Sequence, residues 1–249
     1  MSLTKPSMAK TVQQQFRFKL KGFAGMFMTL FILQLIGLLF SLTGNASFSS
    51  TNAGTELSIQ YYSADIVVAF TMLWGFMSAT QIKTKAYRED DFIFVTSRLS
   101  SDLANIVFLA VTSLLGGITA LLSGFLLKVV VYFLFDSTPI IQSGFTDTPG
   151  ELLTGMLAAA MFIFMLSSAG YLTGTFVHLH KILAYIIPAA VIGLIILWPR
   201  ITGTHLLPAA GEFYFQERSF WLFTCKMMVT TGVLLAGSIV ISHRLEVRT

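Results

Sequence analysis

The chain has 249 residues, of which 55% are hydrophobic and only 11% are charged. Soluble domains usually carry about 25% charged residues, so this composition excludes an ordinary water-soluble fold and predicts a surface that partly faces lipid. The net charge of +4 could suit nucleic acid, but the basic residues are placed as in a membrane protein, and no nucleic-acid partner is expected.

The first element is a basic segment that is predicted to form an amphipathic helix at residues 8–21. Val12, Phe16 and Leu20 recur every four residues, and Arg17 lies on another, polar face. A helix of this kind directly before a membrane span is expected to lie flat on the inner leaflet. An ordinary basic flank without fixed structure is the alternative.

Six segments are apolar enough and close enough to the required length of about 20 residues to cross a bilayer as helices. The predicted spans are residues 22–42, 63–82, 103–127, 152–177, 182–198 and 220–241. The fifth is the shortest, and the third could continue to Phe135. The expected fold class is therefore all-α integral membrane, with a single transmembrane domain over residues 1–249.

Basic residues predict the orientation of these spans. Twelve of the 16 lysines and arginines lie before the first span, between the second and third, between the fourth and fifth, or after the sixth. Basic residues concentrate on the cytoplasmic side of membrane proteins, so both chain ends are predicted to be cytoplasmic.

The outer leaflet is expected to hold three charged side chains. Asp65 and Lys226 lie near the outer ends of their spans, and Lys128 is far enough along the third span to reach the outer headgroups. We hypothesise that Asp65 pairs with one of the two lysines, and independent extension toward the headgroups is the alternative. None of the three is predicted at the bilayer centre, where an ion relay would be expected.

The loop between the second and third spans, residues 83–102, mixes charges with an apolar run. Its acidic cluster favours the start of a short helix, and the aromatic residues after it need a partner, which is either the membrane surface or a groove on another protein. A loop that packs against its own spans is the alternative. The residues expected to carry docking are Glu89, Asp90, Asp91, Phe92, Phe94 and Arg98.

Small residues recur at a spacing of four on the third span (Gly116, Ala120, Gly124) and on the fourth (Gly170, Gly174). This spacing lets helices approach closely and predicts packing contacts rather than chemistry. After the fifth span, an apolar outer segment with several prolines and glycines predicts a short hairpin that dips back into the outer leaflet.

The chain is not expected to be an enzyme. It has no phosphate-binding Gly-x-x-x-x-Gly-Lys-Ser/Thr loop, no Gly-x-Ser-x-Gly elbow and no His-Glu-x-x-His zinc motif. No cofactor or metal site is therefore predicted in this chain, and an intramembrane enzyme is disfavoured.

This layout resembles that of type V ABC exporter permeases. The stretch Asp90-Asp91-Phe92-Ile93-Phe94-Val95-Thr96-Ser97-Arg98-Leu99 is similar to one in short permeases from Gram-positive bacteria, such as exporters of phenol-soluble modulins and other amphipathic peptides. The resemblance implies a multi-pass protein of the bacterial cell membrane, in which two permease copies or homologues form the pathway.

The same resemblance implies separate ATPase subunits, which would hold ATP and magnesium. Residues 89–98 would form the coupling helix, residues 8–21 the elbow helix, and the substrate would be an amphipathic or hydrophobic peptide, toxin or drug. Two further alternatives are the membrane subunit of an energy-coupling uptake system and an assembly factor without transport activity.

Overall fold

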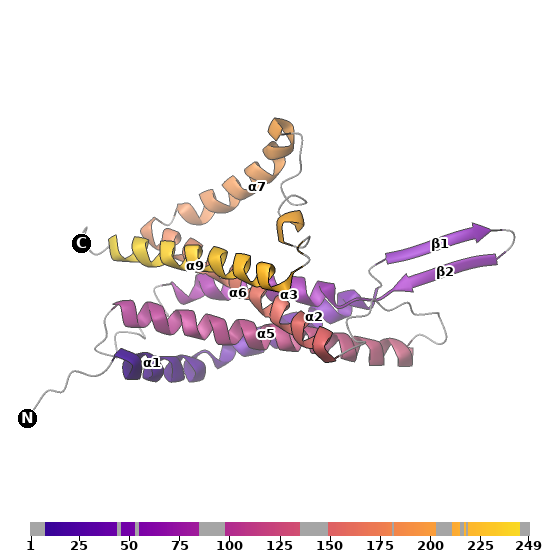
Figure 1. Ribbon diagram of the computed structural model, residues 1–249, viewed down its shortest axis with the longest axis horizontal. Coiled ribbons are helices and arrows are strands. Elements are labelled where there is room, and N and C mark those ends of the chain that lie inside the picture. Colours follow the sequence, from indigo (N-terminus) through magenta and orange to yellow (C-terminus); the bar gives the residue numbers. More distant parts are fainter. Residues whose placement is uncertain are drawn as a thin grey trace, which may run out of the picture. The chain divides into compact units, whose positions relative to one another are not determined.

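The computed structural model describes residues 8–43, 46–52, 55–84, 98–134, 149–180, 182–202, 211–214, 217 and 219–244. Seven long helices and one β hairpin account for most of these residues (Figure 1). The helices are α1 (Met8–Gly22), α2 (Ala24–Ser41), α3 (Asp65–Ile82), α5 (Arg98–Leu134), α6 (Pro149–Leu179), α7 (Leu183–Thr202) and α9 (Phe220–Arg244).

Six of these helices are long and apolar enough to cross a membrane, namely α2, α3, α5, α6, α7 and α9. They confirm the six predicted spans and give the chain the architecture of a multi-pass membrane protein. The main difference is α5, which runs over 37 residues. The predicted third span was too short because it began at the first continuous apolar run, whereas polar residues such as Ser100 and Asp102 are buried inside the helix.

The hairpin between α2 and α3 was not predicted. Strand β1 (Ala46–Asn52) pairs antiparallel with β2 (Thr55–Tyr61), from Ala46 opposite Tyr61 to Asn52 opposite Thr55. The all-α class is therefore confirmed for the six spans, and the hairpin is an addition that the prediction did not include. The prediction relied on apolar runs of span length, and a seven-residue strand rich in serine and threonine does not produce one.

The described chain divides into two compact units. Unit 1 comprises Met1–Phe18, Phe76–Leu109 and Met165–Thr249, and unit 2 comprises Lys19–Gly75 and Ala110–Phe164. In unit 2, an apolar core joins α2, α3 and α5, and its buried members are Leu38, Tyr62, Val67, Ala120, Leu127 and Val131.

The small residues of α5 bring it close to its neighbours in unit 2. A Cβ atom on Gly116 would lie 3.1 Å from Thr71 Cγ2 of α3, and one on Gly124 would lie 3.4 Å from Ala64 Cβ. Ala120, midway between them, is fully buried. The predicted packing role of this stripe is confirmed, because an added Cβ would be tight against Thr71 at Gly116 and in van der Waals contact with Ala64 at Gly124.

Unit 1 contains α7 and α9 together with the adjoining parts of α3, α5 and α6. Thr175 of α6 and Ser238 of α9 share a hydrogen bond of 2.7 Å. Helix α7 leads away from α9 (Figure 1) and has no buried residue within its span. Its apolar side chains therefore need lipid or another helix to cover them.

Candidate functional site

The predicted docking loop lies largely outside the described residues. This applies to Glu89, Asp90, Asp91, Phe92 and Phe94, while Arg98 is the first residue of α5. Both ends of the loop are described. The end of α3 leads into Lys83 on one side, and the start of α5 carries Asp102 on the other.

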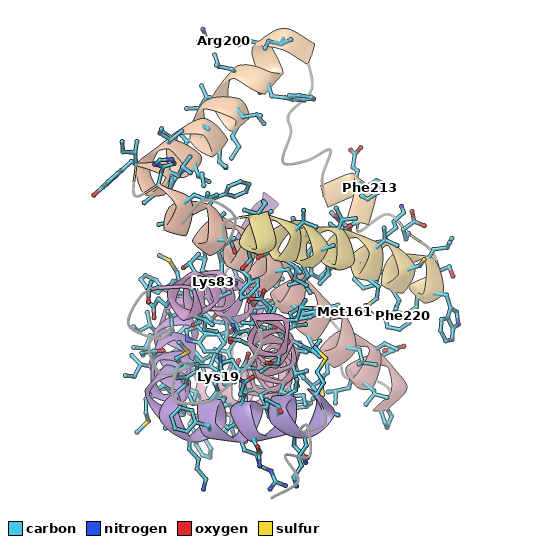
Figure 2. The ribbon with its side chains drawn as sticks, turned by 90° about the vertical axis from the view of Figure 1, so that its left-hand side faces the viewer. Lys19, Lys83, Met161, Arg200, Phe213 and Phe220 are labelled. Carbon is cyan, nitrogen blue, oxygen red and sulfur yellow. The ribbon has the colours of Figure 1, made fainter. Side chains whose placement is uncertain are left out.

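An ion pair joins these two ends. Lys83 Nζ donates to Asp102 Oδ1 over 2.7 Å, with side-chain exposures of 14% for the lysine and 6% for the aspartate. Tyr171 of α6 donates its hydroxyl to the same oxygen, also over 2.7 Å. Three helices thus meet at one carboxylate oxygen, and Figure 2 shows where Lys83 lies among them.

The aromatic ring of Tyr171 adds a second contact with the lysine. Lys83 Nζ lies 4.3 Å from the ring centroid, within the range of a cation–π interaction. Asn105 Nδ2 donates to the Tyr171 hydroxyl over 3.3 Å, and Tyr171 is fully buried. The ammonium group is therefore compensated both by a carboxylate and by an aromatic face.

The glycines of α6 allow α3 to approach closely enough for these contacts. A Cβ on Gly174 would lie 3.0 Å from Thr80 O and 3.1 Å from Lys83 Cβ, and one on Gly170 would overlap the Phe76 carbonyl. The predicted close packing at this pair is confirmed. It follows that α6 can bring Tyr171 to Lys83 only because both positions lack a side chain.

The two carboxylate oxygens of Asp102 differ in their hydrogen bonding. Oδ1 accepts two hydrogen bonds, while Oδ2 is enclosed and makes none. Removing one member of a buried ion pair typically costs about 3–5 kcal/mol, because the other charge stays buried. The arrangement links helices and contains no nucleophile next to a base. Among the described residues, no three His, Cys, Asp or Glu side chains are grouped to hold a metal ion.

Helix α1 covers the predicted amphipathic segment. Val12 is buried, Phe16 and Leu20 are half-buried, and Arg17 is exposed. Two polar neighbours, Gln15 and Lys19, are also buried, which the prediction of an apolar inner face did not include. The position of α1 on the inner leaflet stays a prediction.

Lys226 anchors part of the segment between α7 and α9. Its Nζ bonds to Glu217 Oε1, donates to the Phe213 carbonyl over 3.2 Å, and lies 4.1 Å from the Phe213 ring centroid. Phe213 lies on a short helical turn beside α9 (Figure 2). Since Lys226 is six residues beyond Phe220, about 9 Å along the helix, these contacts hold Phe213 and Glu217 back along α9. Most of the predicted hairpin lies outside the described residues, and its entry into the outer leaflet stays a prediction.

The other two charges that were predicted to lie in the outer leaflet, Asp65 and Lys128, belong to unit 2. Asp65 is exposed in the first turn of α3, where its backbone N–H donates to Ser63 Oγ over 3.2 Å. Lys128 Nζ lies 5.5 Å from the Phe125 ring centroid. The pairing of Asp65 with a lysine stays a prediction, and the carboxylate that does bind Lys226 is Glu217.

Sequence reasoning missed the partners that complete both clusters. Asp102 was treated as the end of a loop, and Tyr171, Asn105 and Glu217 were not singled out. One signal was present in the sequence: a tyrosine within a continuous apolar span needs a partner for its hydroxyl. Nothing in the sequence says that this partner lies 69 residues away along the chain.

Comparisons with known proteins identify no relative. No family model matches the chain, and neither a curated protein nor a solved structure matches it.

Proposed function

We propose that this chain is the transmembrane permease subunit of an ATP-driven exporter, driven by a separate ATPase that docks on residues 89–98. The observation that carries the proposal is the contact of Lys83 and Tyr171 with a single oxygen of Asp102. A docking loop can move membrane helices only if its ends are firmly attached to them. The contacts among Lys83, Asp102 and Tyr171 provide this attachment.

The network favours motion of several helices together. A force on the loop would reach α3 through Lys83 and α5 through Asp102, and Tyr171 would pass it to α6. Separate anchoring of each end would let the loop deform without moving α6. Buried polar networks of this kind stabilise one arrangement of helices against its alternatives.

The proposed substrate is an amphipathic or hydrophobic peptide, toxin or drug. Apolar spans suit such a molecule better than a strongly charged solute, because buried charges are costly in a bilayer. A second permease copy or homologue would complete the pathway in the bacterial cell membrane, and ATP and magnesium would bind to the ATPase partner. Helix α1 would be the elbow helix at the inner leaflet.

The test is co-purification with the ATPase encoded nearest to this gene. Phe92→Ala with Phe94→Ala is expected to abolish ATPase binding and stimulation. A matched control, Ile192→Ala with Ile196→Ala on the exposed surface of α7, removes a similar apolar area and is expected to leave both unchanged.

Three outcomes would contradict the proposal. Unchanged ATPase binding by the Phe92 and Phe94 double variant would remove the docking assignment. Capture of the ATPase only through a second membrane scaffold would indicate an energy-coupling uptake system. Purification without any ATPase, under conditions that preserve such complexes, would indicate an assembly factor.

A further inference from the structure

A neutral polar cluster lies among the apolar spans of unit 2. Gln34 is 10 residues beyond Ala24 in α2, or about 15 Å along the helix, which is near the centre of a bilayer about 30 Å thick. Its Nε2 donates to Thr119 Oγ1 of α5 over 2.9 Å and to Thr71 Oγ1 of α3 over 3.2 Å. The Gly116 carbonyl is 3.4 Å away.

The two threonines determine which way the Gln34 amide faces. Thr71 Oγ1 donates to Val67 O over 2.7 Å, and Thr119 Oγ1 donates to Leu115 O over 2.9 Å. Each hydroxyl thus donates within its own helix and accepts from Gln34, and the Gly116 carbonyl can only accept. The amide nitrogen therefore faces these three groups, and the carbonyl oxygen Oε1 faces away.

This oxygen makes no hydrogen bond with any part of the chain that the structure describes. Gln34 keeps 8% of its surface exposed. Inside a bilayer, a carbonyl oxygen without a donor is costly, because lipid tails offer none. The position thus favours a molecule that brings one.

We propose that Gln34 Oε1 is an acceptor subsite for a neutral hydrogen-bond donor, an amide N–H or a hydroxyl, on an amphipathic molecule inside the membrane. The groups around it, from Thr71, Thr119 and Gly116, are uncharged, so a cationic donor would lack a counter-charge there. The inference rests on the proposed function, since the molecule would be the transported substrate, and it adds a contact within the pathway.

Trp74 provides a local reporter for this site. It is buried one turn beyond Thr71 in α3, and its Nε1 donates to Thr29 Oγ1 over 3.0 Å. The chain has three tryptophans, so replacing Trp198 and Trp221 by phenylalanine leaves Trp74 as the sole donor for energy transfer.

The experiment uses the full chain in lipid nanodiscs, without any ATPase. Two pyrene-labelled long-chain probes are titrated, a primary amide and its N,N-dimethyl derivative, in which methyl groups replace both N–H donors. Gln34→Leu, measured with both probes, corrects for the added methyl volume. The saturable energy transfer from Trp74 is expected to show roughly fivefold tighter binding of the primary amide, the effect of one net hydrogen bond. Gln34→Leu is expected to remove this preference, and Ser113→Ala, which deletes a buried hydroxyl of α5 that makes no hydrogen bond with Gln34, is expected to keep it.

Equal affinity of the two probes for the unaltered chain would overturn the subsite, and this comparison requires no variant to fold. Loss of the preference in Ser113→Ala as complete as in Gln34→Leu would also overturn it, because the loss would then follow from disturbed helix packing rather than from the missing Oε1. Failure of the ATPase co-purification would remove the proposed function without changing the probe comparison, so the two failures are distinguishable.

Discussion

The Asp102→Asn substitution tests whether the ion pair between Lys83 and Asp102 forms and is buried. Asparagine preserves the shape of the side chain but removes the charge opposite Lys83, whose side chain is only 14% exposed and lies 2.7 Å from Oδ1. An uncompensated buried charge costs about 3–5 kcal/mol. We therefore expect the free energy of unfolding to fall by that amount, enough to be measured by titration with SDS in mixed micelles, followed by tryptophan fluorescence.

Two further variants separate the charge from the packing. Lys83→Met with Asp102→Leu removes both charges and is expected to cost far less than Asp102→Asn, since apolar replacement of a complete buried pair is often close to neutral. Tyr171→Phe deletes one hydrogen bond to the carboxylate and is expected to cost about 1–3 kcal/mol. Lys10→Met on the exposed face of α1 is the control, with an expected change within about 0.5 kcal/mol.

A fall of less than about 1 kcal/mol in the free energy of unfolding of Asp102→Asn, the value for an exposed pair, would show that the ion pair is not buried. The ion pair would also be refuted if the double variant costs as much as Lys83→Met and Asp102→Leu, each measured alone, added together. Residues in contact within one network should show a coupling energy of roughly 0.5–3 kcal/mol.

Three other predictions follow from the packing and the charges. Gly174→Val should lower the melting temperature, measured by thermal scanning fluorimetry, by several degrees, because its Cβ would meet Thr80 O at 3.0 Å. Gly193→Val on α7 has open space around it and should have little effect. Equal shifts would contradict the close packing of α6. In a Cys225→Ala background, Lys226→Met should release the segment that carries Phe213 and raise the labelling rate of a Glu212→Cys probe by a hydrophilic maleimide. An unchanged rate would show that the Lys226 contacts do not hold this segment. A green fluorescent protein fused to the C-terminus should fluoresce in bacteria, as expected for a cytoplasmic end, and a dark fusion beside an active C-terminal alkaline phosphatase would reverse the predicted orientation.

Much of the membrane architecture could be predicted from sequence because lipid imposes a length and a composition on each span. Every predicted span overlaps one of the six membrane-length helices. The errors occur where that constraint is absent. The β1–β2 hairpin lies between two spans, and the first turns of α5 carry polar side chains that are buried by neighbouring helices rather than by lipid.

The polar clusters were much less predictable. Lys83 and Asp102 are both visible in the sequence as residues that flank the loop, but their pairing depends on how α3 and α5 pack. Gln34 looks like an isolated polar residue in an apolar run, and only the threonine acceptors on two other helices reveal how its amide is oriented. Such contacts depend on tertiary packing, for which the periodicity of one helix carries no signal.

The length of α5 indicates the depth at which the Asp102 network lies. Its 37 residues span about 55 Å, more than the roughly 40–45 Å of a bilayer with its headgroups. Asp102 precedes Lys128 by 26 residues along this helix, or about 39 Å, so a Lys128 at the outer headgroups puts Asp102 at the inner ones. An ion pair is less costly there than at the bilayer centre, and this is the level at which a cytoplasmic motor would act. Changes at Asp102 should therefore alter ATPase coupling more than substrate preference, whereas changes at Gln34, near the bilayer centre, should do the reverse.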